Sequence, residues 1–210
     1  MINASLLILA VSIAYAMPAQ ADQIRILALG DSLTSGYGLP QGDGFTDQLQ
    51  AALREEGYDV VVLNAGVSGD TTAGGLARLD WSLADDPDLV IVELGSNDAL
   101  RGIDPAVSRA NLDAILAELQ TRGIAALLAG MLAPRNLGTD YVEAFDGMYG
   151  ELAEAYDVPL YPFFLEGVAA EPELNQPDGI HPNASGVAVI VDGILPDVRA
   201  TLDALIEEGS

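Results

Sequence analysis

The sequence predicts a single α/β domain, a three-layer sandwich in which helices cover both faces of a parallel sheet. Short, nearly unbroken apolar runs alternate with longer stretches of helical character along most of the chain. Parallel strands that are buried on both faces show this continuous apolar pattern. Crossovers between such strands are right-handed and place helices on both sides of the sheet. No internal repeat, low-complexity linker or change of composition interrupts the pattern, so we expect residues 22–210 to form one domain.

Four apolar runs are the expected strands, and capping residues set the limits of the helices between them. The runs cover Ile24–Leu29, Val60–Leu63, Leu89–Leu94 and Ile124–Ala129. A helix over Phe45–Glu56 should end at Gly57, because glycine favours the position after a helix. Asp104 and Pro105 supply an N-cap and a first-turn proline for a helix that closes at Gly123. The remaining helices are expected over Thr139–Tyr156, Ala184–Gly193 and Pro196–Glu207.

The first 21 residues have the features of a secretory signal peptide. Leu6–Ala16 is an apolar run too short to span a bilayer comfortably, and Ala19-Gln20-Ala21 matches an A-x-A cleavage pattern. The segment before the run is unusual for a signal, since it carries no Lys or Arg. An uncleaved lipid-facing anchor and a first buried helix are the alternatives. We expect cleavage near Ala21 and Asp22, giving a periplasmic or secreted protein with no stable membrane span.

The composition excludes several function classes. A formal charge of -24 results from 32 acidic residues against 8 arginines, with no lysine. Nucleic acids and anionic lipid surfaces are bound mainly by Lys and Arg clusters, so neither is an expected partner. Absence of lysine removes a Walker-type phosphate loop, a Schiff base and a Ser-Lys dyad. Absence of cysteine removes a thiolate nucleophile and Cys-ligated metals, and one histidine with scattered acids gives no metal-ligand spacing.

The polar residues of chemical interest follow the expected strands. Ser32 comes after the first strand, Gly69 after the second and Asn97 after the third. Ligands of open parallel sheets bind beyond the carboxyl ends of the strands, where these loops would meet. Ser32 lies between glycines at a strand-to-helix turn, which suits either a nucleophile or a helix N-cap. The motif alone does not separate these two interpretations.

His181 is the only histidine, so it is the only imidazole able to activate a serine. Asp178 lies three residues earlier, and in a turn that spacing lets its carboxylate reach the imidazole Nδ1–H. The other ring nitrogen would then be free to accept the proton of a serine. A surface histidine beside a turn-forming aspartate is the alternative.

Acyl transfer also requires donors directed at the developing oxyanion. Gly69 lies in a glycine-rich loop that can present a backbone N–H, and Asn97 offers a neutral side-chain amide. Turn chemistry after a strand is the alternative for Asn97.

Four ordered blocks of this chain resemble those of the SGNH (GDSL) hydrolase family. They are Gly30-Asp31-Ser32-Leu33, a central Gly69, Gly95-x-Asn97-Asp98 and Asp178-x-x-His181-Pro182. Ser68-Gly69-Asp70-Thr71-Thr72 and Leu100-Arg101-Gly102 look like its bacterial periplasmic thioesterase/lysophospholipase/arylesterase branch. The resemblance spans nearly all of the chain after the signal segment, and four blocks in order are more specific than a lone G-D-S-L.

The resemblance implies a flavodoxin-like α/β/α fold and an activated serine. It implies Ser32 as the nucleophile, His181 as the base and Asp178 as the residue that orients the base. It also implies an oxyanion hole formed by the Ser32 N–H, the Gly69 N–H and the Asn97 side chain.

We therefore expect a serine hydrolase that cleaves carboxylic esters, with thioesters as a further class, through an acyl-enzyme. Acyl esters, aryl esters and lysophospholipids are the expected small-molecule or lipid substrates, and the protein is expected to be a monomer without cofactor or metal. A carbohydrate deacetylase and a non-catalytic exported binding module are the alternatives. Apolar residues beside the motifs, which form either an acyl groove or ordinary packing, are Leu33, Leu39, Leu100, Ile103 and Ile180.

Overall fold

The computed structural model of the chain describes residues 23–208 and contains a five-stranded sheet whose paired strands all run parallel. The strand order is β2-β1-β3-β4-β5. The expected signal segment, residues 1–21, lies outside the described residues. The strands are β1 (Ile24–Gly30), β2 (Val60–Gly66), β3 (Leu89–Glu93), β4 (Ala125–Ala129) and β5 (Leu160–Tyr161).

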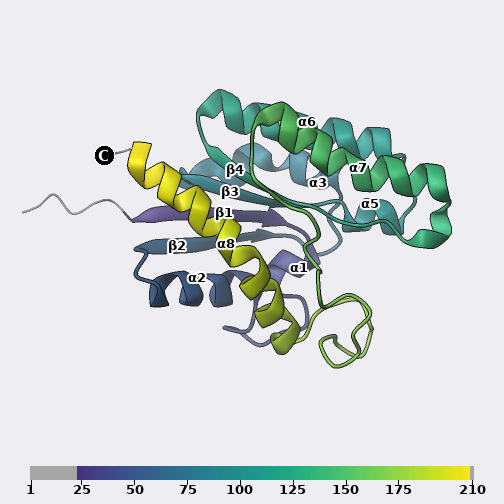
Figure 1. Cartoon of the computed structure of the whole chain (residues 1–210), viewed down its shortest axis with the longest axis horizontal. Helices are drawn as coiled ribbons and strands as arrows, with labels where there is room; N and C mark the ends of the chain where they lie inside the picture. Colours follow the sequence, from purple (N-terminus) through teal and green to yellow (C-terminus); the bar gives the residue numbers. More distant parts are fainter. Residues whose placement is uncertain (1–22, 209–210) are drawn as a thin grey trace, which may run out of the picture.

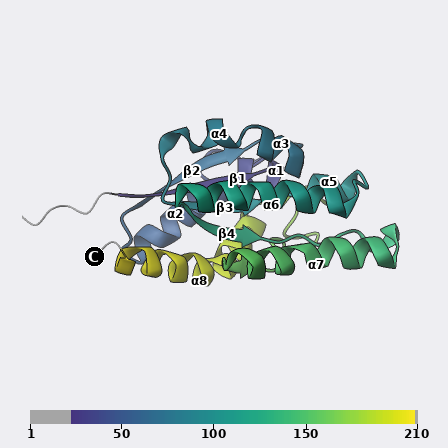
Figure 2. The same cartoon turned by 90° about the horizontal axis from the view of Figure 1, so that it is seen from above.

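Helices cover the sheet in two layers, which confirms the predicted three-layer α/β architecture (Figures 1 and 2). On one side, α2 (Phe45–Glu55) packs against α8 (Ala184–Glu208). On the other side, α6 (Pro105–Arg122) packs between α3 (Thr72–Ala77) and α7 (Thr139–Tyr156). Among residues 23–208, no helix combines the length and the apolar character needed to cross a bilayer.

Short helices not foreseen from the sequence follow the strands or connect the longer helices. Each is only one or two turns long, which is too short for hydrophobic periodicity to reveal. They are α1 (Ser32–Ser35), α3, α4 (Leu79–Ser82) and α5 (Ser96–Leu100), together with two 3₁₀ turns over Leu83–Asp85 and Arg135–Leu137.

The C-terminal region differs from the prediction of two helices. Helix α8 runs without a break from Ala184 to Glu208 and contains Pro196 in its interior. Proline removes one helical hydrogen bond and normally kinks or ends a helix. Buried Ile194 and Val198 lie on either side of the proline, so one apolar stripe continues along the core-facing side of the helix. Packing of this stripe outweighs the local cost of Pro196.

The register of the three central strands brings their carboxyl ends to one level. Gly30, the last residue of β1, pairs with Gly66 of β2 on one side and with Glu93 of β3 on the other. A Cβ atom on Gly66 would overlap the backbone of Ser35, so only glycine allows α1 to lie this close to β2. The segments that follow β1, β2 and β3 therefore leave the sheet side by side.

Candidate active site

Ser32 is the first residue of α1, directly beyond the end of β1. Asp31 is the N-cap of this helix, and its carboxylate accepts a hydrogen bond of 3.0 Å from the Leu33 N–H. The alternative that Ser32 is the N-cap is therefore wrong. Its hydroxyl lies instead 2.9 Å from Nε2 of His181.

His181 lies in the turn before α8, between Ser32 and Asp178. Its Nδ1 is 2.7 Å from Oδ2 of Asp178. The other carboxylate oxygen of Asp178 accepts the backbone N–H groups of Ile180 at 2.9 Å and of His181 at 3.0 Å. The three-residue spacing thus closes a turn in which one carboxylate holds both the backbone and the ring of the histidine.

The hydrogen bond from His181, followed by the two backbone N–H donors, lowers the pKa of Asp178 from 3.8 to about 2. Asp178 is therefore ionised at neutral pH and can only accept hydrogen bonds. An ionised carboxylate at Nδ1 favours the tautomer in which Nδ1 carries the proton. Nε2 is then an acceptor directed at the Ser32 hydroxyl.

Gly69 lies in the loop after β2, which several hydrogen bonds tie to the neighbouring loops. The Val67 N–H donates to the Gly30 carbonyl at 3.0 Å, and the Ser68 and Ser35 hydroxyls lie 3.0 Å apart. The guanidinium of Arg101 donates to the Gly69 carbonyl at 2.8 Å. Gly69 has a φ of 84°, a left-handed conformation that favours glycine.

Asn97 lies in α5, beyond the end of β3, and Asp31 holds its side chain. One Nδ2 hydrogen of Asn97 is donated to Oδ2 of Asp31 at 2.9 Å, and the Ser96 hydroxyl donates to the same oxygen. Burial raises the pKa of Asp31, while hydrogen bonds from Ser96, Leu33 and Asn97 oppose that shift. The amide of Asn97 has a second hydrogen that it can offer to a ligand.

Glu93 and Asp98 are buried beneath the loops that follow β1 and β2, and each accepts hydrogen bonds from them. Burial, and then the nearby charge of Asp31, raise the pKa of Glu93 well above its ordinary value. Its Oε2 accepts the Thr34 hydroxyl at 2.7 Å, whereas Oε1 has no hydrogen-bond partner among the described residues. Asp98 accepts the hydroxyl and the N–H of Thr72.

The apolar residues expected beside the site have different surroundings. Leu33 is buried in the hydrophobic core, and the partly buried Leu39 packs against that core. Ordinary packing therefore accounts for both residues. Ile103 is half-buried. Leu100 and Ile180 are 59% and 52% exposed, respectively.

Tyr37 and Arg78 are neighbours of the site that the sequence reasoning missed. The ring of Tyr37 lies with its centroid 4.6 Å from that of His181. Arg78 pairs with Asp70 at 2.6 Å and donates to the Gly30 carbonyl at 2.9 Å, so it braces β1 and the loop after β2. The sequence gives one indication that Tyr37 lies near the site, namely its position five residues after Ser32. No sequence pattern indicates that Arg78 does.

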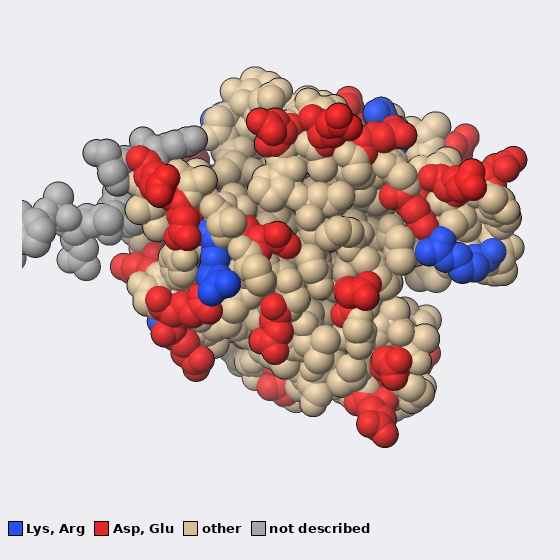
Figure 3. Space-filling model, in the orientation of Figure 1, with Lys and Arg blue, Asp and Glu red and all other residues tan. Residues whose placement is uncertain are grey.

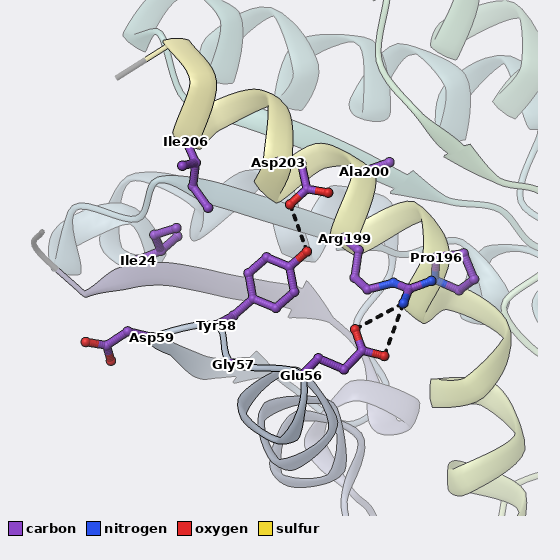
Figure 4. Close-up of a pocket in the computed structure, with 10 residues that line it drawn as sticks. All are labelled: Ile24, Glu56, Gly57, Tyr58, Asp59, Pro196, Arg199, Ala200, Asp203 and Ile206. Atoms are coloured by element: carbon purple, nitrogen blue, oxygen red, sulfur yellow. Dashed lines mark hydrogen bonds and ion pairs between the residues drawn. The ribbon is translucent and has the colours of Figure 1, made fainter. Parts of the chain in front are cut away.

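A hollow of about 750 Å³ lies near the opposite, amino ends of β1 and β2 (Figure 4). Tyr58 donates its hydroxyl to Asp203 at 2.8 Å there, and Arg199 pairs with Glu56 at 3.1 Å. The described part of the chain gathers no group of three or more His, Asp or Glu side chains placed to hold a metal ion.

Acidic side chains are scattered over the face seen in Figure 3, where the blue basic groups are few. Five of the arginines form ion pairs with carboxylates. With these arginines paired, acidic groups dominate the charge of this face.

A model of the GDSL-like lipase/acylhydrolase family matches residues 28–189. Esterase TesA of Pseudomonas aeruginosa is 42% identical over 184 residues, which are 87% of this chain and 92% of TesA. The Escherichia coli K12 protein named thioesterase 1/protease 1/lysophospholipase L1 is 40% identical over 80% of this chain and 79% of its own. The crystal structure of AlinE4, an SGNH-hydrolase family esterase, has a TM-score of 0.73 and 51% identity, covering 88% of this chain and 99% of that chain. The four sequence blocks therefore indicated the right family, and the chain belongs to the GDSL-like lipase/acylhydrolase family.

Proposed function

We propose that this protein is a serine hydrolase that cleaves carboxylic esters through an acyl-enzyme, with Ser32, His181 and Asp178 as its catalytic residues. The observation that carries the proposal is the continuous chain from the Ser32 hydroxyl through both ring nitrogens of His181 to Asp178, at 2.9 and 2.7 Å. A nucleophile, a base and an orienting carboxylate in this order define the serine-hydrolase arrangement on several unrelated folds.

In the first half of the reaction, Oγ of Ser32 attacks the ester carbonyl carbon while its proton moves to Nε2 of His181. The tetrahedral intermediate collapses, its bond to the leaving oxygen breaks, and His181 returns the proton to that oxygen. Water then repeats the sequence: it loses a proton to His181 and attacks the acyl carbon, and the bond to Oγ of Ser32 breaks as His181 returns the proton to that oxygen and the acid leaves. Asp178 stays ionised throughout and stabilises the imidazolium.

The backbone N–H groups of Ser32 and Gly69 and the side-chain amide of Asn97 form the proposed oxyanion hole. Asp31 fixes one amide hydrogen of Asn97, which leaves the other at a set angle. Arg101 fixes the loop of Gly69 through its carbonyl. Donors held before the reaction need no reorganisation as negative charge develops, which is the basis of their catalytic effect.

Acyl esters, aryl esters, thioesters and lysophospholipids are the substrates we propose to compare. The names of the relatives, an esterase and a thioesterase/lysophospholipase, support this range. Exposed Leu100 and Ile180 and half-buried Ile103 are the proposed contacts of the acyl chain. Hydrolysis of nitrophenyl esters of increasing chain length, beside lysophospholipid, acyl-CoA and acetylated sugars, will rank the classes.

Labelling with a fluorophosphonate probe tests the mechanism directly. We expect stoichiometric labelling of Ser32, mapped by mass spectrometry, and no labelling of His181→Ala. A label on Ser68, or none on the unaltered protein, would contradict the proposal. Faster hydrolysis of acetylated sugars than of fatty-acyl esters would instead favour a carbohydrate deacetylase, and neither label nor hydrolysis would favour a binding module.

We also propose that residues 1–21 direct export and are removed before Asp22, leaving a monomeric periplasmic or secreted enzyme. The A-x-A pattern at Ala19-Gln20-Ala21 supports cleavage, and all three proposed catalytic side chains come from one chain. N-terminal sequencing of the exported protein and size-exclusion chromatography test these two points. An intact Met1 or a stable dimer would contradict them.

A further inference from the structure

Tyr37 presents an exposed aromatic ring directly beside the proposed base. Its ring centroid lies 4.6 Å from that of His181, with the two planes tilted by 40°. The residue is 52% exposed, so part of it remains accessible to a ligand beside His181. Its backbone N–H donates to the Ser32 carbonyl at 3.1 Å, which ties Tyr37 to the nucleophile as well.

Gln176 fixes Tyr37 relative to His181 by bonding to both loops. Its side-chain amide donates to the Tyr37 carbonyl at 2.7 Å and to the Pro182 carbonyl at 3.0 Å. Its backbone N–H donates to the His181 carbonyl at 2.7 Å. Gly38, with a φ of 75°, follows the tyrosine, and a Cβ atom there would overlap Oε1 of Gln176. The backbone beneath the ring is therefore held in place before a substrate arrives.

The chemistry of the leaving group places it next to this ring. The leaving oxygen takes its proton from Nε2 of His181, so it must come within about 3 Å of that atom. Whatever is bonded to that oxygen then lies against the exposed neighbours of the imidazole, and Tyr37 is such a neighbour. In the proposed oxyanion hole the carbonyl oxygen is bound by Gly69 and Asn97, so the two ends of an ester have different neighbours.

We propose that Tyr37 determines leaving-group specificity by stacking with the aromatic ring of an aryl ester. This inference rests on the proposed function, and it names the substrate class that the site favours. Aromatic rings attract one another at centroid separations of about 4.5–7 Å in offset or edge-to-face geometry. A fixed ring at the exit of the leaving group offers such a contact to phenols and none to small alkyl alcohols.

A purely supporting role for Tyr37 predicts the opposite change in selectivity. If the ring only kept His181 in place, its removal would weaken proton delivery to the leaving oxygen. An alkyl alcohol is a weaker acid than a phenol, so its departure depends more on that proton. The alkyl ester would then lose more activity than the aryl ester, whereas loss of a stacking contact affects the aryl ester alone.

The test compares phenyl acetate with trifluoroethyl acetate, an activated alkyl ester that gives the same acetyl-enzyme. Because deacylation is shared, kcat/KM for the two esters reports differences in acylation only. A contact of about 0.5–1.5 kcal/mol corresponds to roughly 2- to 12-fold, so we expect Tyr37→Ala to lower the aryl-to-alkyl ratio of kcat/KM by that factor. Tyr37→Phe keeps the ring and should keep the ratio. Trp81→Ala removes another exposed aromatic ring, on α4, and is the matched control with an unchanged ratio.

The possible outcomes separate this inference from the proposed function. An unchanged or increased ratio in an active Tyr37→Ala variant overturns the role of Tyr37 and leaves the serine-hydrolase proposal intact. Hydrolysis of neither ester by the unaltered protein overturns the proposed function, and this inference with it. Activity of Tyr37→Ala on the alkyl ester also serves as the internal control for folding.

Discussion

The two ends of the parallel sheet both gather polar side chains, and they differ in how those groups are paired. At the amino end, Arg199 binds Glu56 and Tyr58 binds Asp203, so these four side chains satisfy one another in two pairs. At the carboxyl end, the groups are connected in series, from Asp178 through His181 to the Ser32 hydroxyl. An isolated pair of polar groups stabilises the two segments that it joins. A chain of hydrogen bonds that ends on a hydroxyl instead allows the ionised Asp178, acting through His181, to make that hydroxyl more nucleophilic. The volume of a hollow is therefore a poor guide to reactivity in this molecule.

Substitution of the proposed nucleophile should show the largest difference in catalytic effect between the two ends of the sheet. We expect Ser32→Ala or His181→Ala to lower kcat for a nitrophenyl ester by about 10⁴-fold or more, as in other serine hydrolases. Steady-state kinetics on the purified variants measures this change. Tyr58→Phe removes a hydroxyl from the amino end and should leave kcat unchanged. Full esterase activity in Ser32→Ala would refute the assignment of the nucleophile.

Asn97→Ala should have the next largest effect. Removing one oxyanion-hole donor lowers kcat by about 10² to 10³-fold, with little change in KM, because the interaction strengthens only as charge develops. Asn97→Asp keeps the size of the side chain but replaces the donor with an acceptor, and it should be as impaired as the alanine variant. A decrease confined to KM would indicate that Asn97 contacts the ground state of the substrate instead.

Most of the sheet was predictable from sequence because the strands β1, β3 and β4 are largely buried on both faces. Ile91 and its neighbours in β3 give an apolar run that only Glu93 interrupts. Strand β5 was missed because Leu160–Tyr161 is too short to show any pattern. Helix α8 is continuous where Pro196 predicts a break, because tertiary packing outweighs the local effect of the proline.

The contacts of the candidate site also differ in how far the sequence predicts them. The meeting of Ser32 and His181 could be anticipated, since one imidazole and a strand-end serine leave few combinations. The clamp of Gln176 on Tyr37 could not, because it joins loops 139 residues apart through side-chain and carbonyl atoms. Contacts of this kind depend on register and loop shape, which residue types alone do not specify.

Glu93 provides a test of the buried layer under the reactive loops. Its pKa is raised in the folded protein, so the folded state keeps a proton that the unfolded chain releases above about pH 4.5. Stability conferred by this group is therefore present at low pH and is lost as pH rises, with a slope of at most about 1.4 kcal/mol per pH unit.

Glu93→Gln removes this titration while keeping the shape of the protonated acid. We expect the free energy of unfolding of the variant, relative to the unaltered protein, to increase between pH 5 and pH 7.5. Urea unfolding at the two pH values measures the difference. Parallel pH dependences in the two proteins would show that Glu93 is ionised in the fold.

The smallest effect is expected at the amino end of the sheet, from Arg199→Ala. Side chains of Arg199 and Glu56 are 41% and 35% exposed, and ion pairs with such access to water contribute about 0–1 kcal/mol. For a domain of this size that corresponds to a decrease in Tm of at most about 4 °C, which should shrink at high salt because exposed charges are screened. Esterase activity should not change, since Arg199 pairs with Glu56 at the opposite end of the sheet from Ser32 and His181. A loss of activity in this variant with Tm preserved would show that the two ends are coupled, and would remove the distinction between isolated pairs and a reactive series.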